Sequence, residues 1–281
     1  MRKFRFLFYL AIVSTSAAFS QKNDPVKDWK LSVQMWTFNK STFVEGLDMA
    51  RSCGFKYIEA YPGQKLGGSL QGEIGPNRPV QERTALKALL KSKGISMIAF
   101  GVVDGVDDAR TTEAWKKNFE FAREMGCEEI TVMPTAAQLD MVNKLAAQYH
   151  IRAAIHDEPG NTPYRNPDSV VVAISGRPFL GACVDMGNWA RNGVNVVAAI
   201  RDQLKGRIFS VHLKDVRQAG VVSTPDVVLG TGQANVAAVL KELKAAGFSG
   251  FLSLEHESDK VADLMAIKAD VAFYKKVVSG L

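Results

Sequence analysis

Four residues that can bind a metal ion or move a proton stand at or near the ends of four consecutive apolar runs. His156 ends IRAAIH, and Asp185 ends FLGACVD. His212 lies in IFSVHLKD, and Glu255 lies in FLSLEHE. Mixed imidazole and carboxylate ligands suit Mn²⁺, Co²⁺, Fe²⁺ or Zn²⁺, whereas Mg²⁺ and Ca²⁺ prefer oxygen ligands. We therefore predict one divalent metal, with Mn²⁺ as the first choice, bound by His156, Asp185, His212 and Glu255.

Alternation along the strands supports a shared site. Residues two apart in a strand point to the same face, so Lys214 shares a face with His212, and Glu257 shares one with Glu255. His256 has the opposite parity and is expected to face away. A single polar strand end is more often a structural hydrogen-bonding group, but four on successive strands indicate a common site.

The elements that must position these residues alternate between strands and helices. Eight apolar runs are expected to be strands: 31–38, 56–61, 95–103, 129–134, 151–156, 179–185, 208–215 and 251–257. The residues expected at the ends of the first four are Thr37, Glu59, Val103 and Met133. Helical patterns lie between the strands, most clearly at 236–246, and several end at glycines suited to the left-handed conformation: Gly54, Gly94, Gly126 and Gly247. This alternation predicts an α/β fold, a single-domain (β/α)8 TIM barrel with its site at the carboxyl ends of the strands.

Composition excludes several other classes of protein. A chain of 281 residues with 47% hydrophobic and 23% charged residues is neither a collagen, a coiled coil nor a wholly disordered protein. Its formal charge of +6 suggests nucleic acid, but three of the basic residues are Arg2, Lys3 and Arg5 at the N-terminus. We therefore expect no nucleic-acid partner. Three cysteines are too few for a disulfide framework.

The first 20 residues predict a secretory signal peptide. A basic start precedes an apolar run over 6–13, which is too short to span a membrane, and small residues then precede Gln21. Cleavage before Gln21 leaves a leader over 21–30 and a barrel domain over 31–281. We expect an exported protein, periplasmic or secreted, with no stable membrane insertion after cleavage. An uncleaved N-terminal anchor is the alternative.

Several segments resemble the xylose isomerase-like TIM barrel family of sugar phosphate isomerases and epimerases. These segments are KYIEAYPG, IRAAIHDEPG, LGACVDMGNWAR, VHLKDV and GFLSLEHE, and the resemblance runs from about Leu31 to the C-terminus. It implies one divalent metal bound by a residue from each of the last four strands, here His156, Asp185, His212 and Glu255. It also implies that Glu59, on the second strand, lies near the substrate.

The chain departs from the family pattern at three positions. Sugar 3-epimerases of the family carry on strand five a Glu that is both ligand and acid/base, and His156 stands there. A branch of the family reads IHNHG where this chain reads IHDEPG, which supplies Glu158. After strand six, the family's D-x-G-H becomes DMGN, so Asn188 replaces a His that often contacts substrate. The reaction therefore stays open between isomerisation, epimerisation and elimination.

The resemblance implies removal of a proton next to a carbonyl, through an enediolate that the metal stabilises. Glu255 is the first candidate base, Glu158 is the second, and Lys214 is expected to steady the developing oxyanion. Candidate substrate-binding residues, with the two tryptophans as sugar-stacking walls, are Glu59, Trp36, Trp189, Asn188 and Arg191.

We predict a metal-dependent sugar isomerase or epimerase that acts on a non-phosphorylated carbohydrate, because phosphorylated sugars are mainly cytoplasmic. A 3-keto-glycoside lyase or hydrolase on the same metal site is the nearest alternative. A non-catalytic sugar-binding barrel is the alternative of another class, and it would not need all four ligands. The family also resembles endonuclease IV, whose zinc site needs more histidines than the four in this chain. The oligomeric state stays open.

Overall fold

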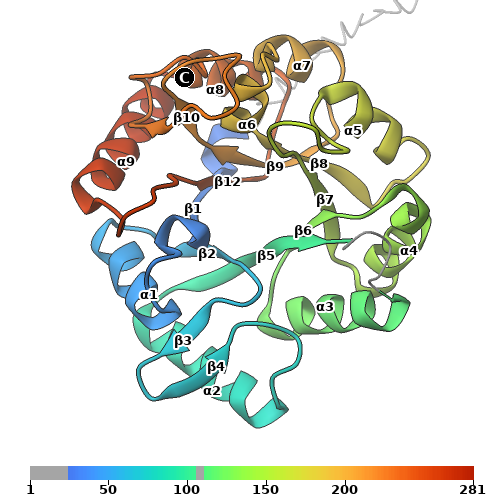
Figure 1. The fold of residues 1–281 in the computed structure, drawn as a ribbon, viewed down its shortest axis with the longest axis vertical. Coiled ribbons are helices and arrows are strands. Elements are labelled where there is room, and N and C mark those ends of the chain that lie inside the picture. Colours follow the sequence, from blue (N-terminus) through green and yellow to red (C-terminus); the bar gives the residue numbers. More distant parts are fainter. Residues whose placement is uncertain (1–24, 106–110) are drawn as a thin grey trace, which may run out of the picture.

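A computed structural model describes residues 25–105 and 111–281, and it contains a closed barrel of eight parallel strands. Figure 1 shows these strands as a central ring enclosed by helices. Around the ring the strands are β1 (Lys30–Gln34), β12 (Phe251–Leu254), β9 (Ile208–Leu213), β8 (Leu180–Asp185), β7 (Arg152–His156), β6 (Glu129–Met133), β5 (Ser96–Asp104) and β2 (Tyr57–Ala60). The predicted single-domain (β/α)8 fold is confirmed.

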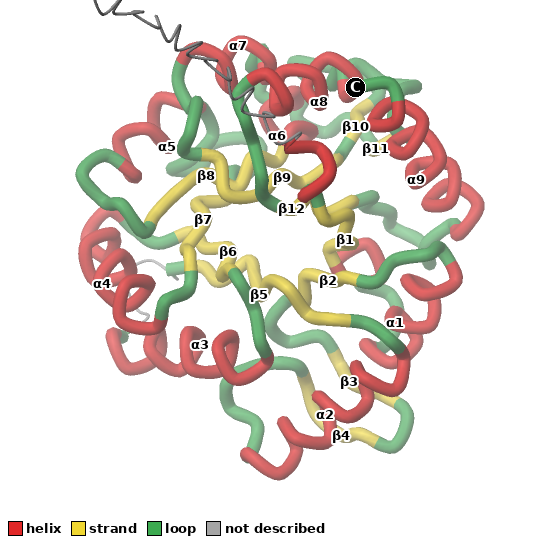
Figure 2. Tube along the Cα trace, turned by 180° about the vertical axis from the view of Figure 1, so that it is seen from behind, coloured by secondary structure: helices red, strands yellow, loops and turns green. Residues whose placement is uncertain are grey.

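The helices cover the outer face of the barrel, as the view from behind in Figure 2 also shows. They are α1 (Phe43–Ser52), α2 (Val80–Lys93), α3 (Thr112–Met125), α4 (Leu139–Tyr149), α5 (Pro167–Ile174), α6 (Met186–Arg191), α7 (Val196–Asp202), α8 (Val236–Ala245) and α9 (Leu264–Ser279). Large apolar side chains such as Trp115, Phe119 and Phe121 are fully buried between helices and strands. Burial of this apolar surface is the main stabilising term of the fold.

Two short hairpins and three 3-10 helices complete the described chain. β3 (Lys65–Gly67) pairs with β4 (Leu70–Glu73) outside the barrel ring, beside α2 (Figures 1 and 2). β10 (Asp215–Val216) pairs with β11 (Asp226–Val227) after β9. The 3-10 helices are η1 (Pro25–Asp28), η2 (Met35–Phe38) and η3 (Ala136–Gln138).

Local sequence accounts for where helices begin and end. Thr42 and Glu45 form a capping box at the start of α1, which satisfies backbone N–H groups that have no partner within the helix. Gly94 and Gly126 end α2 and α3 with φ of 66° and 84°. Residues with a Cβ rarely adopt that conformation, so the glycines expected to end helices do so.

Two strand ends differ from the prediction. β1 ends at Gln34 because the chain turns into η2, so Thr37 lies in a 3-10 helix and not at a strand end. β5 continues one residue past Val103, to Asp104. Both shifts change which side chains reach the mouth of the barrel.

The predicted signal peptide, residues 1–20, lies outside the described residues. Among the helices in residues 25–105 and 111–281, none has the length and apolar character required to cross a membrane.

Candidate functional site

The four predicted ligands converge at the carboxyl ends of β7, β8, β9 and β12. One donor atom from each of His156, Asp185, His212 and Glu255 lies within 4.8 Å of all the others. His156 Nε2 lies 3.2 Å from His212 Nδ1, and His212 Nδ1 lies 3.0 Å from Glu255 Oε2. Asp185 Oδ2 lies 3.8 Å from His156 Nε2. Separations of this size are those of atoms that share one metal ion with bonds of about 2.0–2.2 Å.

The nitrogen and oxygen atoms of this cluster are suitable ligands for a divalent metal. Asp185 is the N-cap of α6, where its Oδ1 accepts the backbone N–H of Asn188 at 2.9 Å. Asp185 Oδ2 and Glu255 Oε2 are buried, and Lys214 Nζ lies 2.8 and 3.2 Å from them. A buried carboxylate needs a compensating positive charge, and a divalent cation between the four donor atoms would add to the charge that Lys214 supplies. The cluster has the mixed nitrogen and oxygen donors that Mn²⁺, Co²⁺, Fe²⁺ and Zn²⁺ accept.

Glu59 is fully buried beneath the cluster and holds His212 in place. Its Oε2 lies 3.0 Å from His212 Nε2, and Thr131 and Ser253 donate to the same carboxylate at 2.5 and 2.7 Å. Burial raises the pKa of Glu59, but the charge and hydrogen bond of His212, together with the hydrogen bonds from Thr131 and Ser253, keep this pKa below the usual value. Glu59 does not line the cavity described below, and its contacts with His212 are those of a positioning residue.

The charges of the other ligands follow from burial and from each other. Burial, followed by the neighbouring His212, lowers the pKa of His156 to about 4, so this imidazole is neutral and able to bind a metal. Burial raises the pKa of Asp185, but Lys214 and the two imidazoles lower it to about 2. Asp185 is therefore an anion throughout the neutral range.

Lys214 lies among the carboxylates of the cluster although its side chain is almost fully buried. Its Nζ lies 2.8 Å from Asp185 Oδ2, 3.2 Å from Glu255 Oε2 and 2.5 Å from Glu257 Oε1. Burial alone lowers the pKa of Lys214, but the three carboxylates hold it well above the usual value. The stem of Lys214 passes over Gly187, where an added Cβ would lie 2.5 Å from Lys214 Cγ. Lys214 is therefore a fixed cation and not a mobile lysine at the rim.

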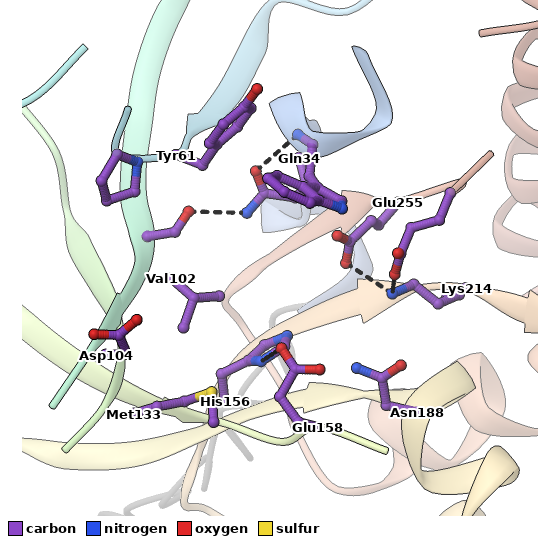
Figure 3. Close-up of a pocket in the computed structure, with 14 residues that line it drawn as sticks. Gln34, Tyr61, Val102, Asp104, Met133, His156, Glu158, Asn188, Lys214 and Glu255 are labelled. Carbon is purple, nitrogen blue, oxygen red and sulfur yellow. Dashed lines mark hydrogen bonds and ion pairs between the residues drawn. The ribbon is translucent and has the colours of Figure 1, made fainter. Parts of the chain in front are cut away.

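A cavity of about 450 Å³ opens above the cluster of His156, Asp185, His212 and Glu255. Figure 3 shows His156, Glu158, Asn188, Lys214 and Glu255 around it, with Met133 beside His156 and Asp104 on the side away from Lys214. Its full lining is Gln34, Trp36, Tyr61, Pro62, Gly101, Val102, Asp104, Met133, His156, Glu158, Asn188, Lys214, Glu255 and Glu257. This volume lies within the range of small-molecule sites.

Glu158 is the carboxylate of this lining most suited to accept a proton near neutral pH. Its side chain is 40% exposed, and its Oε1 lies 3.7 Å from His156 Nδ1. Burial raises the pKa of Glu158 to about 7, with Asp185 and Glu255 adding to the effect and Lys214 opposing it. A general base works best when its pKa is near the working pH.

The structure places only some of the predicted substrate-binding residues in the lining of the cavity. Trp36 and Asn188 line the cavity. Trp189 is fully buried, with its indole packed in the core, so the expected stacking role is not supported, because its ring face does not reach the cavity. Arg191 donates to Asn188 Oδ1 at 2.9 Å and pairs with Asp226, and it lines a neighbouring cavity instead.

Sequence reasoning missed Gln34, Tyr61 and Asp104, which all line the cavity. Gln34 and Asp104 are the last residues of β1 and β5. The expected strand ends were Thr37 and Val103. A prediction that ended β1 earlier and β5 one residue later would have identified Gln34 and Asp104. Tyr61 follows the end of β2 and packs against Trp36, and no feature of its local sequence distinguishes it from a core tyrosine.

The chain belongs to the xylose isomerase-like TIM barrel family, whose match covers residues 47–277. This agrees with the resemblance inferred from the sequence and with the position of the four candidate metal ligands at the last four barrel strands.

Three solved structures show the range of similar proteins. An uncharacterized protein from Parabacteroides distasonis is 34% identical, with a TM-score of 0.71 over 89% of this chain and 99% of that chain. An L-ribulose 3-epimerase is 17% identical, with a TM-score of 0.67 over 90% and 95% of the two chains. A D-allulose 3-epimerase from Methylomonas sp., in complex with D-allulose, is 14% identical, with a TM-score of 0.68 over 88% and 96%. At the two lower identities the likeness concerns the fold alone. Among curated proteins, none matches the chain.

Proposed function

We propose that this protein is a metal-dependent sugar isomerase or epimerase that removes a proton next to the carbonyl of a non-phosphorylated carbohydrate. The observation that carries the proposal is the convergence of four ligand atoms, from His156, Asp185, His212 and Glu255, at the floor of a cavity that also contains Glu158. A divalent metal held there supplies Lewis-acid polarisation of the carbonyl, which makes the adjacent C–H more acidic.

Three residues of the cavity have different roles in the proposed reaction. Glu158 is the base, because it lines the cavity without being needed as a ligand and because its pKa is near 7. Glu255, the first candidate from sequence, is placed between His212 and Lys214 at 3.0 and 3.2 Å, which favours a ligand role. Lys214 supplies a fixed positive charge for an oxyanion that develops on the substrate.

The charge of the cavity supports an uncharged sugar as substrate. Its basic and acidic side chains are Lys214, His156 and four carboxylates: Asp104, Glu158, Glu255 and Glu257. Such a surface disfavours a phosphate group. The D-allulose bound to the Methylomonas epimerase supports a sugar ligand for this fold. Export directed by residues 1–20 remains our proposal and fits a non-phosphorylated substrate.

Incubation with candidate sugars in D₂O tests the reaction directly. We expect deuterium to enter a carbon-bound position next to the carbonyl, and we expect His212→Ala to abolish this exchange. No exchange with any sugar in metal-supplied protein would contradict the mechanism. Sugar binding without exchange would instead indicate a non-catalytic sugar-binding barrel.

A 3-keto-glycoside lyase or hydrolase is the second candidate function. His156 stands at the strand-five position where the resemblance places an acid/base Glu in the 3-epimerases, and here it is a neutral imidazole in the ligand cluster. Among the carboxylates of the cavity lining, Glu158 is the one with a pKa raised to about 7, and elimination needs a base on one face of the sugar only. Release of the aglycone from a 3-keto glycoside, followed by NMR, distinguishes this reaction from epimerisation.

A further inference from the structure

A second cavity, of about 610 Å³, adjoins the one above the metal cluster. Trp36 and Glu257 line both cavities and therefore form the boundary between them. The second cavity is formed by the segments that follow η2 and β12, together with Arg191 of α6 and Asp226 of β11.

Trp36 is placed as a shared aromatic wall. Its side chain is 42% exposed, although large apolar side chains are usually buried. The ring of Tyr61 packs edge-on against it, with 4.9 Å between ring centroids and 76° between planes. This contact fixes the indole and leaves part of it accessible. Aromatic rings with an apolar face and a polar edge are well suited to contact amphipathic ligands.

The polar walls of the second cavity are held in place before any ligand binds. Arg191, which is more than nine-tenths buried, pairs with Asp226 Oδ1 at 2.5 Å. Asp226 Oδ2 accepts the backbone N–H of Glu257 at 2.7 Å. The ring of His256 is fixed by a 2.9 Å contact between its Nδ1 and Asp270 Oδ2. Preorganised donors and acceptors beside an aromatic face are the chemistry that recognises a hydroxylated ring.

Resting on the proposed function, we propose that the second cavity binds a second sugar ring, so that the substrate is a disaccharide rather than a free monosaccharide. The reacting ring then lies above the metal cluster, and the glycosidic linkage passes between Trp36 and Glu257. This assigns Arg191 and His256 to recognition of the second ring. It also accounts for the position of Arg191, which is a wall of the second cavity and not of the first.

A substitution that blocks the second cavity tests whether this cavity binds a second sugar ring. Ser258 is exposed and lines the second cavity alone, so Ser258→Trp fills it without touching the metal cluster. Ser92→Trp, at an exposed position of α2, is the matched control. The probes are glucose and its reducing disaccharides maltose and cellobiose, titrated calorimetrically into protein supplied with Mn²⁺. Asp259→Trp replaces Ser258→Trp if circular dichroism shows that the latter is unfolded.

We expect at least one disaccharide to bind about tenfold or more tightly than glucose, a difference of about 1.4 kcal/mol. We expect Ser258→Trp to remove this advantage and Ser92→Trp to retain it. The assignment is overturned if no disaccharide binds more tightly than glucose, or if the advantage survives the blocking variant. Disaccharide binding without deuterium exchange contradicts the proposed function and retains the second-ring site. Exchange on a monosaccharide, without tighter binding of any disaccharide, supports the proposed function and contradicts the second-ring site.

Discussion

Glu59 Oε2 lies 3.0 Å from His212 Nε2, deep inside the barrel and on the side of the imidazole away from the other three candidate ligands. An ionised carboxylate can only accept, so Nε2 carries the proton and Nδ1 is the nitrogen that can bind a metal. Carboxylates that orient metal-binding histidines in this way are a recurring feature of metal sites.

Glu59→Gln is expected to weaken metal binding by about 10–100-fold without removing a ligand. The amide can no longer act as a charged acceptor for His212 Nε2, so the imidazole loses both orientation and basicity. Metal competition titrations measure the change, with the exposed Glu113→Gln on α3 as control. An unchanged metal affinity would contradict the positioning role.

His212→Ala should abolish stoichiometric metal binding. The wild-type protein is expected to retain about one equivalent of Mn, Co, Fe or Zn, as measured by elemental mass spectrometry. His150→Asn is the matched control, because His150 is exposed and has a φ of 54°, a conformation that Asn tolerates. Retention of metal by the His212 variant would exclude the proposed ligand set.

Glu158→Gln should reduce deuterium exchange by about 10²–10⁴-fold while metal content stays unchanged. Because the pKa of Glu158 is raised to about 7, a base at this position is protonated below that pH and free above it. The exchange rate of the wild type should therefore rise with pH up to about 7 and then level. A variant that keeps the wild-type rate and pH profile would assign the base elsewhere.

Lys214→Met should change metal affinity and the rate of deuterium exchange in opposite directions. Lys214 Nζ lies 2.8 Å from Asp185 Oδ2 and 3.2 Å from Glu255 Oε2, two atoms of the ligand cluster. Removing this competing cation should strengthen metal binding, whereas exchange should slow because the oxyanion loses its fixed positive charge. A purely structural lysine would predict that both properties decline together. Metal titration and the D₂O assay on one preparation decide between these outcomes.

Glu129→Gln should stabilise the fold at alkaline pH. Glu129 is fully buried at the start of β6, and burial, only partly offset by Arg152, raises its pKa to about 7. The folded state therefore holds a proton that the unfolded state releases above about pH 4.5. The stability that this proton contributes is present below that pH and is lost as the pH rises through 7.

The free energy of unfolding of Glu129→Gln is expected to exceed that of the wild type by at most about 3 kcal/mol at pH 8, and by close to zero at pH 4.5. Urea unfolding at both pH values measures it, with the half-exposed Glu128→Gln as the neighbouring control. An equal gain at both pH values would contradict the assignment to Glu129.

Sequence patterns were sufficient for the barrel and for the ligand cluster, because both depend on strand register. Alternation in β9 and β12 places His212 on the inner face, and Glu255 continues this face one residue after β12 ends, where its N–H still bonds to Leu213. The resemblance to the family agreed with these positions. Trp189 was misplaced because α6 follows β8 directly and turns the indole into the core. Such a turn depends on packing between elements, which local sequence does not specify.

The close approach of Lys214 to Gly187 links two positions that are far apart along the chain. Because a Cβ at position 187 would lie 2.5 Å from Lys214 Cγ, the absence of a side chain at one position is a condition for the long side chain at the other. The same Cβ would lie 2.8 Å from Lys214 Cβ, an atom that every residue except glycine has. Among homologues, glycine should therefore persist at position 187 even where a shorter side chain replaces Lys214.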